Sequence, residues 1–101
     1  HPIRDSLTSA YASPEQFRHA DRDPRDDVFA LGCITYQILT GGHPFQFRPI
    51  DEVAREGLVP APVEGLSPQA WNTLRQALEF DRNKRLGDVD SFLKGLFEMQ
   101  D

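Results

Sequence analysis

The middle of this chain carries a long helical pattern. From Asp26 or Asp27 to Leu39, apolar and small residues recur every three or four positions, which is the spacing of one helix face. One face carries Val28, Leu31, Gly32, Thr35, Ile38 and Leu39, and a second face carries Phe29, Cys33 and Tyr36. A helix that is apolar on nearly all sides is normally buried. The pattern therefore predicts a central buried helix over residues 27–40, ended by Gly41 as a left-handed C-cap.

Shorter helices are predicted on both sides of the central one. Ser13 followed by Pro14 is typical of a helix N-terminus and predicts a short helix to about Ala20. Residues 18–27 are dense in charge and include Pro24, which predicts a solvated loop. Further helices are expected over residues 50–57, after Ser67 and after Asp88. No segment alternates as a strand does, so the predicted fold class is all-α, with about four to five helices around the central one.

Composition and charge exclude several function classes. The 101 residues carry 16 Asp+Glu and 11 Lys+Arg, for a net charge of −5 without a basic tract, so neither nucleic acid nor an anionic membrane is an expected partner. The single cysteine, Cys33, excludes an internal disulfide framework and fits a reducing, cytoplasmic location. The apolar run after Val28 has only about twelve residues, too few to span a bilayer. The three histidines stand far apart, so no metal site is expected.

Four short motifs follow one another in a fixed order. They are TSAYASPE at residues 8–15, DVFALG at 27–32, LTGGHPF at 39–45 and LEFDRNKR at 78–85. Each is weak alone, but together they resemble the C-terminal half of the large lobe of eukaryotic-type Ser/Thr protein kinases, and bacterial members most of all. The resemblance covers about residues 6–97. It implies a partial kinase domain, in which residues 1–13 end the activation segment and form the acceptor-site loop, and residues 14–101 form a helical subdomain.

The resemblance assigns roles to two pairs of residues. Glu15 matches the glutamate of the Ala-Pro-Glu motif that closes the activation segment, and Arg85 matches the distant arginine with which that glutamate pairs. Such a pair can pin a loop to a helix junction, although on the residues alone Glu15 could simply favour a helix N-terminus. Thr8 and Tyr11 match the threonine and tyrosine of the acceptor loop in Ser/Thr-specific members, and they imply protein Ser/Thr substrates.

Three further positions acquire a role from the resemblance. Asp27 matches the aspartate whose carboxylate accepts backbone N–H bonds from the catalytic loop, whereas on the sequence alone it would be only a helix N-terminal carboxylate. Gly32 matches a glycine at which a side chain would crowd the neighbouring backbone. Ser6 lies where activation-loop phosphosites occur and is a candidate phosphosite.

The chain also departs from the family pattern. Leu7 stands where glycine is usual, Asp26 where serine is frequent, and Arg82 where proline is frequent. Leu7 weakens the expectation of an active loop conformation. No role is assigned to the other departures.

The family's catalytic machinery does not occur in these 101 residues. Phosphoryl transfer needs a nucleotide clamp, metal-binding carboxylates and a residue that orients the hydroxyl. The family supplies these from a Gly-rich loop, a strand lysine, a His-Arg-Asp loop and an Asp-Phe-Gly site, none of which is found here. We therefore expect no catalytic residue in this chain, ATP and Mg only in a longer parent, and no phosphoryl transfer by the chain alone. The chain begins with His1 rather than Met, which also indicates a piece of a larger protein.

Three hypotheses remain open at this point. The parent is an active Ser/Thr kinase, or it is a pseudokinase that binds and regulates without catalysis, or the chain is an unrelated small helical interaction domain. Because the central helix has too few neighbours to cover it, we expect the face with Phe29, Cys33 and Tyr36 to be exposed. Self-association of the chain through this apolar surface, by exchange of helices between copies, is the predicted consequence.

Overall fold

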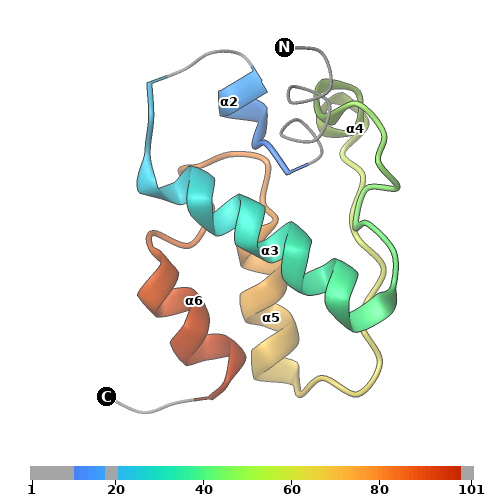
Figure 1. Ribbon diagram of the computed structural model, residues 1–101, viewed down its shortest axis with the longest axis vertical. Helices are drawn as coiled ribbons and strands as arrows, with labels where there is room; N and C mark the ends of the chain where they lie inside the picture. Colours follow the sequence, from blue (N-terminus) through green and yellow to red (C-terminus); the bar gives the residue numbers. More distant parts are fainter. Residues whose placement is uncertain (1–10, 18–20, 99–101) are drawn as a thin grey trace.

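The computed structural model describes residues 11–17 and 21–98, and five helices lie within them (Figure 1). They are α2 (Pro14–Phe17), α3 (Pro24–Thr40), α4 (Ile50–Glu56), α5 (Pro68–Ala77) and α6 (Val89–Leu96). No strand is found in these described ranges, so the predicted all-α fold class is confirmed.

The long helix α3 crosses the middle of the molecule (Figure 1). It packs against α5 and α6, which also pack against each other, while α2 contacts α4. The core forms where α3 meets α5 and the loop that follows α3. Phe29, Phe45, Leu74 and Phe92 are fully buried there, and the rings of Phe29 and Phe45 stack with centroids 6.1 Å apart. The central helix is thus enclosed on one side by material that lies after it in the sequence.

The start of α3 differs from the sequence prediction. The helix begins at Pro24, inside the segment that was expected to be a solvated loop. Asp23 is its N-cap and accepts a hydrogen bond from the Arg25 N–H (2.9 Å), while Asp26 Oδ2 accepts one from the Asp23 N–H (3.2 Å). The capping box fixes the start of the helix at Pro24. Proline is acceptable there because the first helical position needs no N–H donor. The charged residues at this point are therefore cap residues of a helix.

The exposed face of α3 also differs from the prediction. Phe29 and Cys33 are fully buried and Tyr36 is 7% exposed, so the expectation that this face would be open was wrong. The physical reason is that α5 and the loop after α3 cover it, and the Tyr36 hydroxyl donates to Ala61 O (2.7 Å). The apolar side chains left exposed are on the opposite side, with Ile38 78% exposed.

A groove of about 490 Å³ follows this exposed side between α3 and α6. It is lined by Leu31, Thr35, Ile38, Leu39, Leu66, Phe92, Leu93, Leu96 and Phe97. Self-association of the chain stays a prediction, but the surface first named for it is not the one that is open.

The remaining helix ends follow the residue types that predicted them. Gly41 closes α3 in the left-handed region (φ 80°), and its N–H donates to Gln37 O (2.8 Å). Ser67 caps α5 by accepting from the Ala70 N–H (3.1 Å), and Asp88 caps α6 by accepting from the Ser91 N–H (2.7 Å). In the part of the chain that is described, no helix is both long and apolar enough to cross a bilayer.

Candidate functional site

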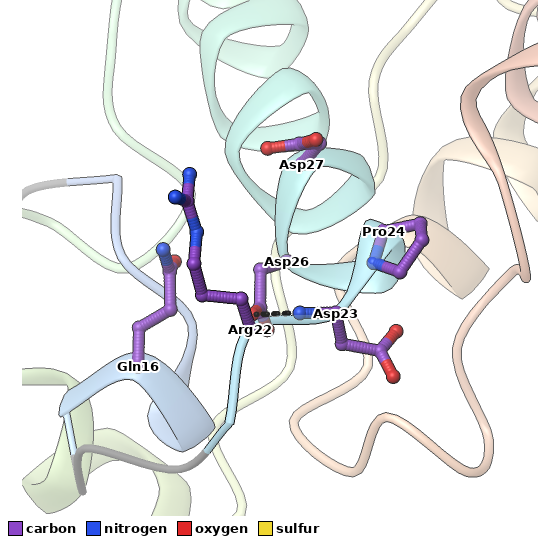
Figure 2. A pocket seen from close by; sticks show the side chains of 6 residues that line it. All are labelled: Gln16, Arg22, Asp23, Pro24, Asp26 and Asp27. Atoms are coloured by element: carbon purple, nitrogen blue, oxygen red, sulfur yellow. Dashed lines mark hydrogen bonds between the residues drawn. The ribbon is translucent and has the colours of Figure 1, made fainter.

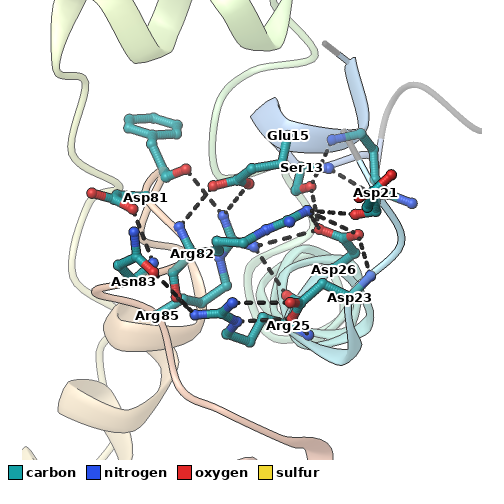
Figure 3. A network of polar contacts seen from close by, with 12 residues as sticks. Ser13, Glu15, Asp21, Asp23, Arg25, Asp26, Asp81, Arg82, Asn83 and Arg85 are labelled. Carbon is teal, nitrogen blue, oxygen red and sulfur yellow. Dashed lines mark hydrogen bonds and ion pairs between the residues drawn. The ribbon is translucent and has the colours of Figure 1, made fainter. Parts of the chain in front are cut away.

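A buried ion pair joins two segments that lie 70 residues apart (Figure 3). Arg85 Nη2 lies 2.8 Å from Glu15 Oε1, with the Arg85 side chain fully buried and that of Glu15 10% exposed. The second oxygen of Glu15 accepts the backbone N–H of Arg82 (2.7 Å). The structure thus brings together the two residues that the resemblance paired, and both carboxylate oxygens are engaged.

Each nitrogen of the Arg85 guanidinium donates at least one hydrogen bond. The guanidinium donates to three backbone carbonyls, Glu79 O (2.8 Å), Phe80 O (3.0 Å) and Arg25 O (3.0 Å). Its central carbon also lies 5.0 Å from the centroid of the buried Phe29 ring. Arg85 therefore fastens α2, the first turn of α3 and the turn after α5 to one another. A charge this deeply buried is tolerated because each of its three nitrogens donates a hydrogen bond and Glu15 supplies the opposite charge.

The short helix α2 places Glu15 for this pair. The Gln16 N–H donates to Ser13 Oγ (3.2 Å), and the Ser13 N–H donates to Gln16 Oε1 (3.0 Å). This reciprocal capping box, with Pro14 at the first helical position, lets a helix of only four residues form. The geometry of this helix directs the side chain of Glu15 towards the core.

The pKa of Glu15 is lowered from its ordinary value of 4.5. Burial raises it, but the hydrogen bonds from the Arg85 side chain and from the Arg82 N–H, together with the positive charge of Arg85, outweigh burial. The folded chain therefore favours the charged carboxylate, which couples the stability of the fold to pH.

This coupling predicts an acid-dependent loss of stability. A carboxylate whose pKa is depressed by folding stabilises the fold fully above pH 4.5, and this stabilisation is lost as pH falls through the lower folded pKa. We expect urea unfolding, followed by Trp71 fluorescence, to show a decrease in the free energy of unfolding below pH 4.5 that is smaller in Glu15→Gln. The exposed Glu64→Gln is the matched control, and an unchanged acid profile in Glu15→Gln would contradict the prediction.

Asp27 lies on the first turn of α3 beside an open pocket of about 250 Å³ (Figure 2). The pocket is lined by Gln16, Arg22, Asp23, Pro24, Asp26 and Asp27. Asp27 is exposed, and its carboxylate accepts no hydrogen bond from the residues that the structure describes. It is thus available to donors from outside this part of the chain.

Tyr11 ties the segment before α2 to α3. Its hydroxyl donates to Gln37 Oε1 (2.8 Å), and its ring centroid lies 5.9 Å from that of His43. His43 is itself buried, and its Nδ1 accepts the N–H of Phe45 (3.0 Å) and of Phe47 (3.3 Å). The sequence analysis assigned His43 no role; its place directly after a helix-ending Gly-Gly pair is the only hint that it organises a loop.

The other predicted positions fall in different surroundings. Thr8 and Ser6 lie outside the described residues. A Cβ on Gly32 would lie 3.1 Å from both Ala77 Cβ and Leu78 Cδ2, so the close approach is to side chains at the end of α5 rather than to backbone. Gly32 therefore sets how closely α3 and α5 can pack, and it has no contact with the pocket beside Asp27.

The described residues do not form a site for ATP and Mg. They contain no group of three or more His, Cys, Asp or Glu side chains that could hold a metal ion. Among the described residues, Arg22 is the only basic one that lines the pocket beside Asp27, and the other charged residues described there are carboxylates, which would repel a polyphosphate. The contacts described here join the starts of α2 and α3 to the turn after α5.

A known protein family matches most of the chain. The family described as "Protein kinase domain" matches residues 4–97. This chain belongs to the protein kinase family. The predicted resemblance, which covered about residues 6–97, is confirmed.

Similar kinases come from bacteria and from animals. The Ser/Thr-protein kinase PknL of Mycobacterium tuberculosis is 41% identical over 68 residues, covering 61% of this chain and 17% of PknL. The Ser/Thr-protein kinase Sgk3 of Rattus norvegicus is 33% identical over 90 residues, covering 86% of this chain and 18% of Sgk3. The chain thus spans less than a fifth of the length of these relatives.

Solved kinase structures have the same fold in this region. The Cydia pomonella granulovirus kinase PK-1 matches with a TM-score of 0.73 and 26% identity, over 92% of this chain and 36% of that one. A structure of the Rad53 kinase domain with SCD2 and AMPPNP matches with a TM-score of 0.66 and 26% identity, over 91% of this chain and 39% of that one. The helical arrangement described above is therefore part of a kinase domain.

One cluster in this kinase region was missed by the sequence analysis. Asp26 is buried, and its Oδ1 accepts from Ser13 Oγ (2.9 Å) and from Arg82 Nη2 (3.1 Å). The sequence marks Asp26 and Arg82 as departures from the family pattern, but it does not connect them with each other or with Ser13. The available signal was that three positions, at which the family typically has an alanine, a serine and a proline, here carry side chains that can hydrogen-bond to one another.

Proposed function

We propose that this chain is the peptide-facing and scaffolding part of a Ser/Thr protein kinase catalytic domain. Residues 1–13 end the activation segment and form the acceptor-site loop, and residues 14–101 form the helical subdomain that supports it. The observation that carries the proposal is the buried Glu15–Arg85 pair, which holds the residues just after the acceptor loop against the core. The Ser/Thr kinases among its relatives support the substrate class.

In this proposal the acceptor loop is held at two points. Glu15 anchors its C-terminal end through Arg85, and Tyr11 anchors it to α3 through Gln37 (2.8 Å). Thr8, which lies outside the described residues, would help to shape the site for the acceptor hydroxyl. Ser6, farther along the loop, is a site at which a phosphate would regulate loop conformation.

Asp27 has the role of an anchor for the catalytic loop. Its exposed carboxylate, in the first turn of α3, would accept backbone N–H bonds from a loop outside these 101 residues. A carboxylate that accepts several such bonds holds its partner loop without supplying any reacting atom. Asp27 is therefore a positioning residue in this proposal.

ATP and Mg belong, in this proposal, to the part of the domain that lies outside this chain. They would supply the phosphoryl group and neutralise its charge, whereas the present residues position the protein substrate. A cytoplasmic location fits this role, because the single Cys33 is buried and reduced and ATP is an intracellular substrate.

Phosphoryl transfer by two forms of the protein tests the proposal. The 101-residue chain, incubated with Mg-ATP and a mixture of Ser- and Tyr-containing peptides, is expected to show no incorporation above buffer. The full-length protein is expected to phosphorylate the Ser/Thr peptides and not the Tyr peptides. Turnover by the short chain would refute the division of roles, and a full-length protein without any transfer would support the pseudokinase hypothesis instead.

A further inference from the structure

The strongest unassigned feature is the buried polar cluster formed by Ser13, Asp26 and Arg82 beside the Glu15–Arg85 pair (Figure 3). Asp26 is 4% exposed, and Ser13 is fully buried. The carboxylate of Asp26 accepts three donors, from Ser13 Oγ, from Arg82 Nη2 and from the Asp23 N–H. A buried carboxylate at this depth needs its cation, because water cannot replace it.

Arg82 connects this cluster to the neighbouring ion pair. Its backbone N–H donates to Glu15 Oε2 (2.7 Å), while its guanidinium binds Asp26 (3.1 Å). Within the described part of the chain, Asp26 is the only carboxylate at ion-pair distance from that guanidinium, and the Nε of Arg82 has no hydrogen-bond partner there. Arg85 Nη1 also lies 3.8 Å from Asp26 Oδ1, so the two ion pairs form one network.

The cluster joins the starts of α2 and α3, and both helix starts have a role in the proposed function. Ser13 caps α2, which carries Glu15, and Asp26 precedes Asp27 in the first turn of α3. A rigid link between these two helix starts fixes the end of the acceptor segment relative to the proposed catalytic-loop anchor. The Glu15–Arg85 pair holds the second residue of α2, and the cluster holds Ser13, which caps the helix.

We propose that Ser13, Asp26 and Arg82 are interdependent positioning residues that hold the end of the acceptor segment on the first turn of α3. The identification of this segment as the acceptor segment rests on the proposed function, but the link itself does not. The three residues replace the alanine, serine and proline typical of the family, and we infer that they do so as a set. Removing Asp26 or Arg82 alone leaves the other charge without this partner, whereas removing both leaves neither charge in place.

Amide hydrogen exchange on the 101-residue chain tests the link directly. Arg82→Met keeps the backbone N–H on Glu15 and removes the guanidinium, and Asp26→Ser restores the residue frequent in the family. Each single variant is expected to raise the exchange rate of the Gln16 amide, which bonds Ser13 Oγ, by about 10- to 100-fold. The double variant is expected to raise it by much less than the product of the two.

Two comparisons keep this result interpretable. The amides of Leu78 and Phe92, at the end of α5 and in α6, should change far less, because the effect is local. The matched control is Arg55→Met with Asp51→Ser, an exposed pair 3.9 Å apart on α4, where no effect on Gln16 is expected. Multiplicative single effects, or equal acceleration at Leu78 and Phe92, would overturn the proposal, because the cluster would then be uncoupled or merely a contributor to global stability.

A kinetic measurement on the full-length protein tests whether the link serves substrate binding. The Asp26→Ser/Arg82→Met variant is expected to raise the KM for a Ser/Thr peptide several-fold while the KM for ATP is unchanged, since the segment faces the peptide. A change in both constants, or in neither, would refute the positioning role. An unsubstituted protein without any phosphoryl transfer would refute the proposed function, and the exchange result would still decide whether the link exists.

Discussion

Replacing Arg85 by methionine is expected to lower the free energy of unfolding of this chain by about 3–5 kcal/mol. The substitution keeps an unbranched apolar stem, so the loss comes mainly from charge. It strands the Glu15 carboxylate, which is 10% exposed, and it leaves the carbonyls of Glu79, Phe80 and Arg25 without their donor. Small domains are stable by only about 5–15 kcal/mol, so this loss would remove between about a fifth of that stability and all of it. Urea unfolding followed by circular dichroism measures the change.

Two further variants separate the ion pair from general damage. Glu15→Gln combined with Arg85→Met removes both charges, and it should be clearly more stable than the sum of the two single losses predicts. Arg55→Met removes an arginine whose side chain is 75% exposed and should cost less than about 1 kcal/mol. If Arg85→Met costs no more than Arg55→Met, or if the two single losses simply add, Glu15 acts only as a helix N-terminal carboxylate.

Asp27→Asn in the full-length protein is expected to lower kcat by about 100-fold, because a displaced catalytic loop misplaces the groups that act on the substrate. The fold should hardly change, since Asp27 is exposed and contributes under about 1 kcal/mol as a helix N-terminal charge. The measurement pairs steady-state phosphorylation of a Ser/Thr peptide with thermal unfolding of the same samples. A large loss of rate without a loss of stability is the expected signature.

The matched control is Asp90→Asn. Asp90 occupies the same kind of position, in the first turn of α6, and its side chain is 75% exposed and far in sequence from the proposed site. We expect kcat to stay within about twofold of the unsubstituted protein, the range of an exposed surface change. If Asp27→Asn behaves like Asp90→Asn, Asp27 does not anchor a catalytic loop in this protein.

The starts and ends of the helices show which local sequence signals were sufficient to predict a helix boundary. Ser67 and Asp88 were recognised as helix starts because an N-cap acts through bonds to residues only three positions away. The same logic should have identified Asp23 as the cap of α3, but the charge density around it was taken for a solvated loop. Pro24 was counted there as a helix breaker although it occupies the one helical position that suits it.

Burial was harder to predict than helicity. The pattern of α3 identified two apolar faces, but it did not show which one the rest of the chain would cover. Phe29 and Tyr36 are covered by residues that follow α3, including Phe45 and Ala61, and such long-range packing leaves no trace in local periodicity. For this reason the open apolar surface was assigned to the wrong side of the helix.

Residue types in a fixed order were enough to predict the fold class and the family, and to suggest the pairing of Glu15 with Arg85 as a hypothesis. The meeting of Asp26, Ser13 and Arg82 is visible only in the folded chain, because these residues lie 13 to 69 positions apart and none is distinctive alone. The physical reason is general. Hydrogen bonding within one helix turn is encoded locally, whereas the partners of a buried charge depend on how distant segments pack.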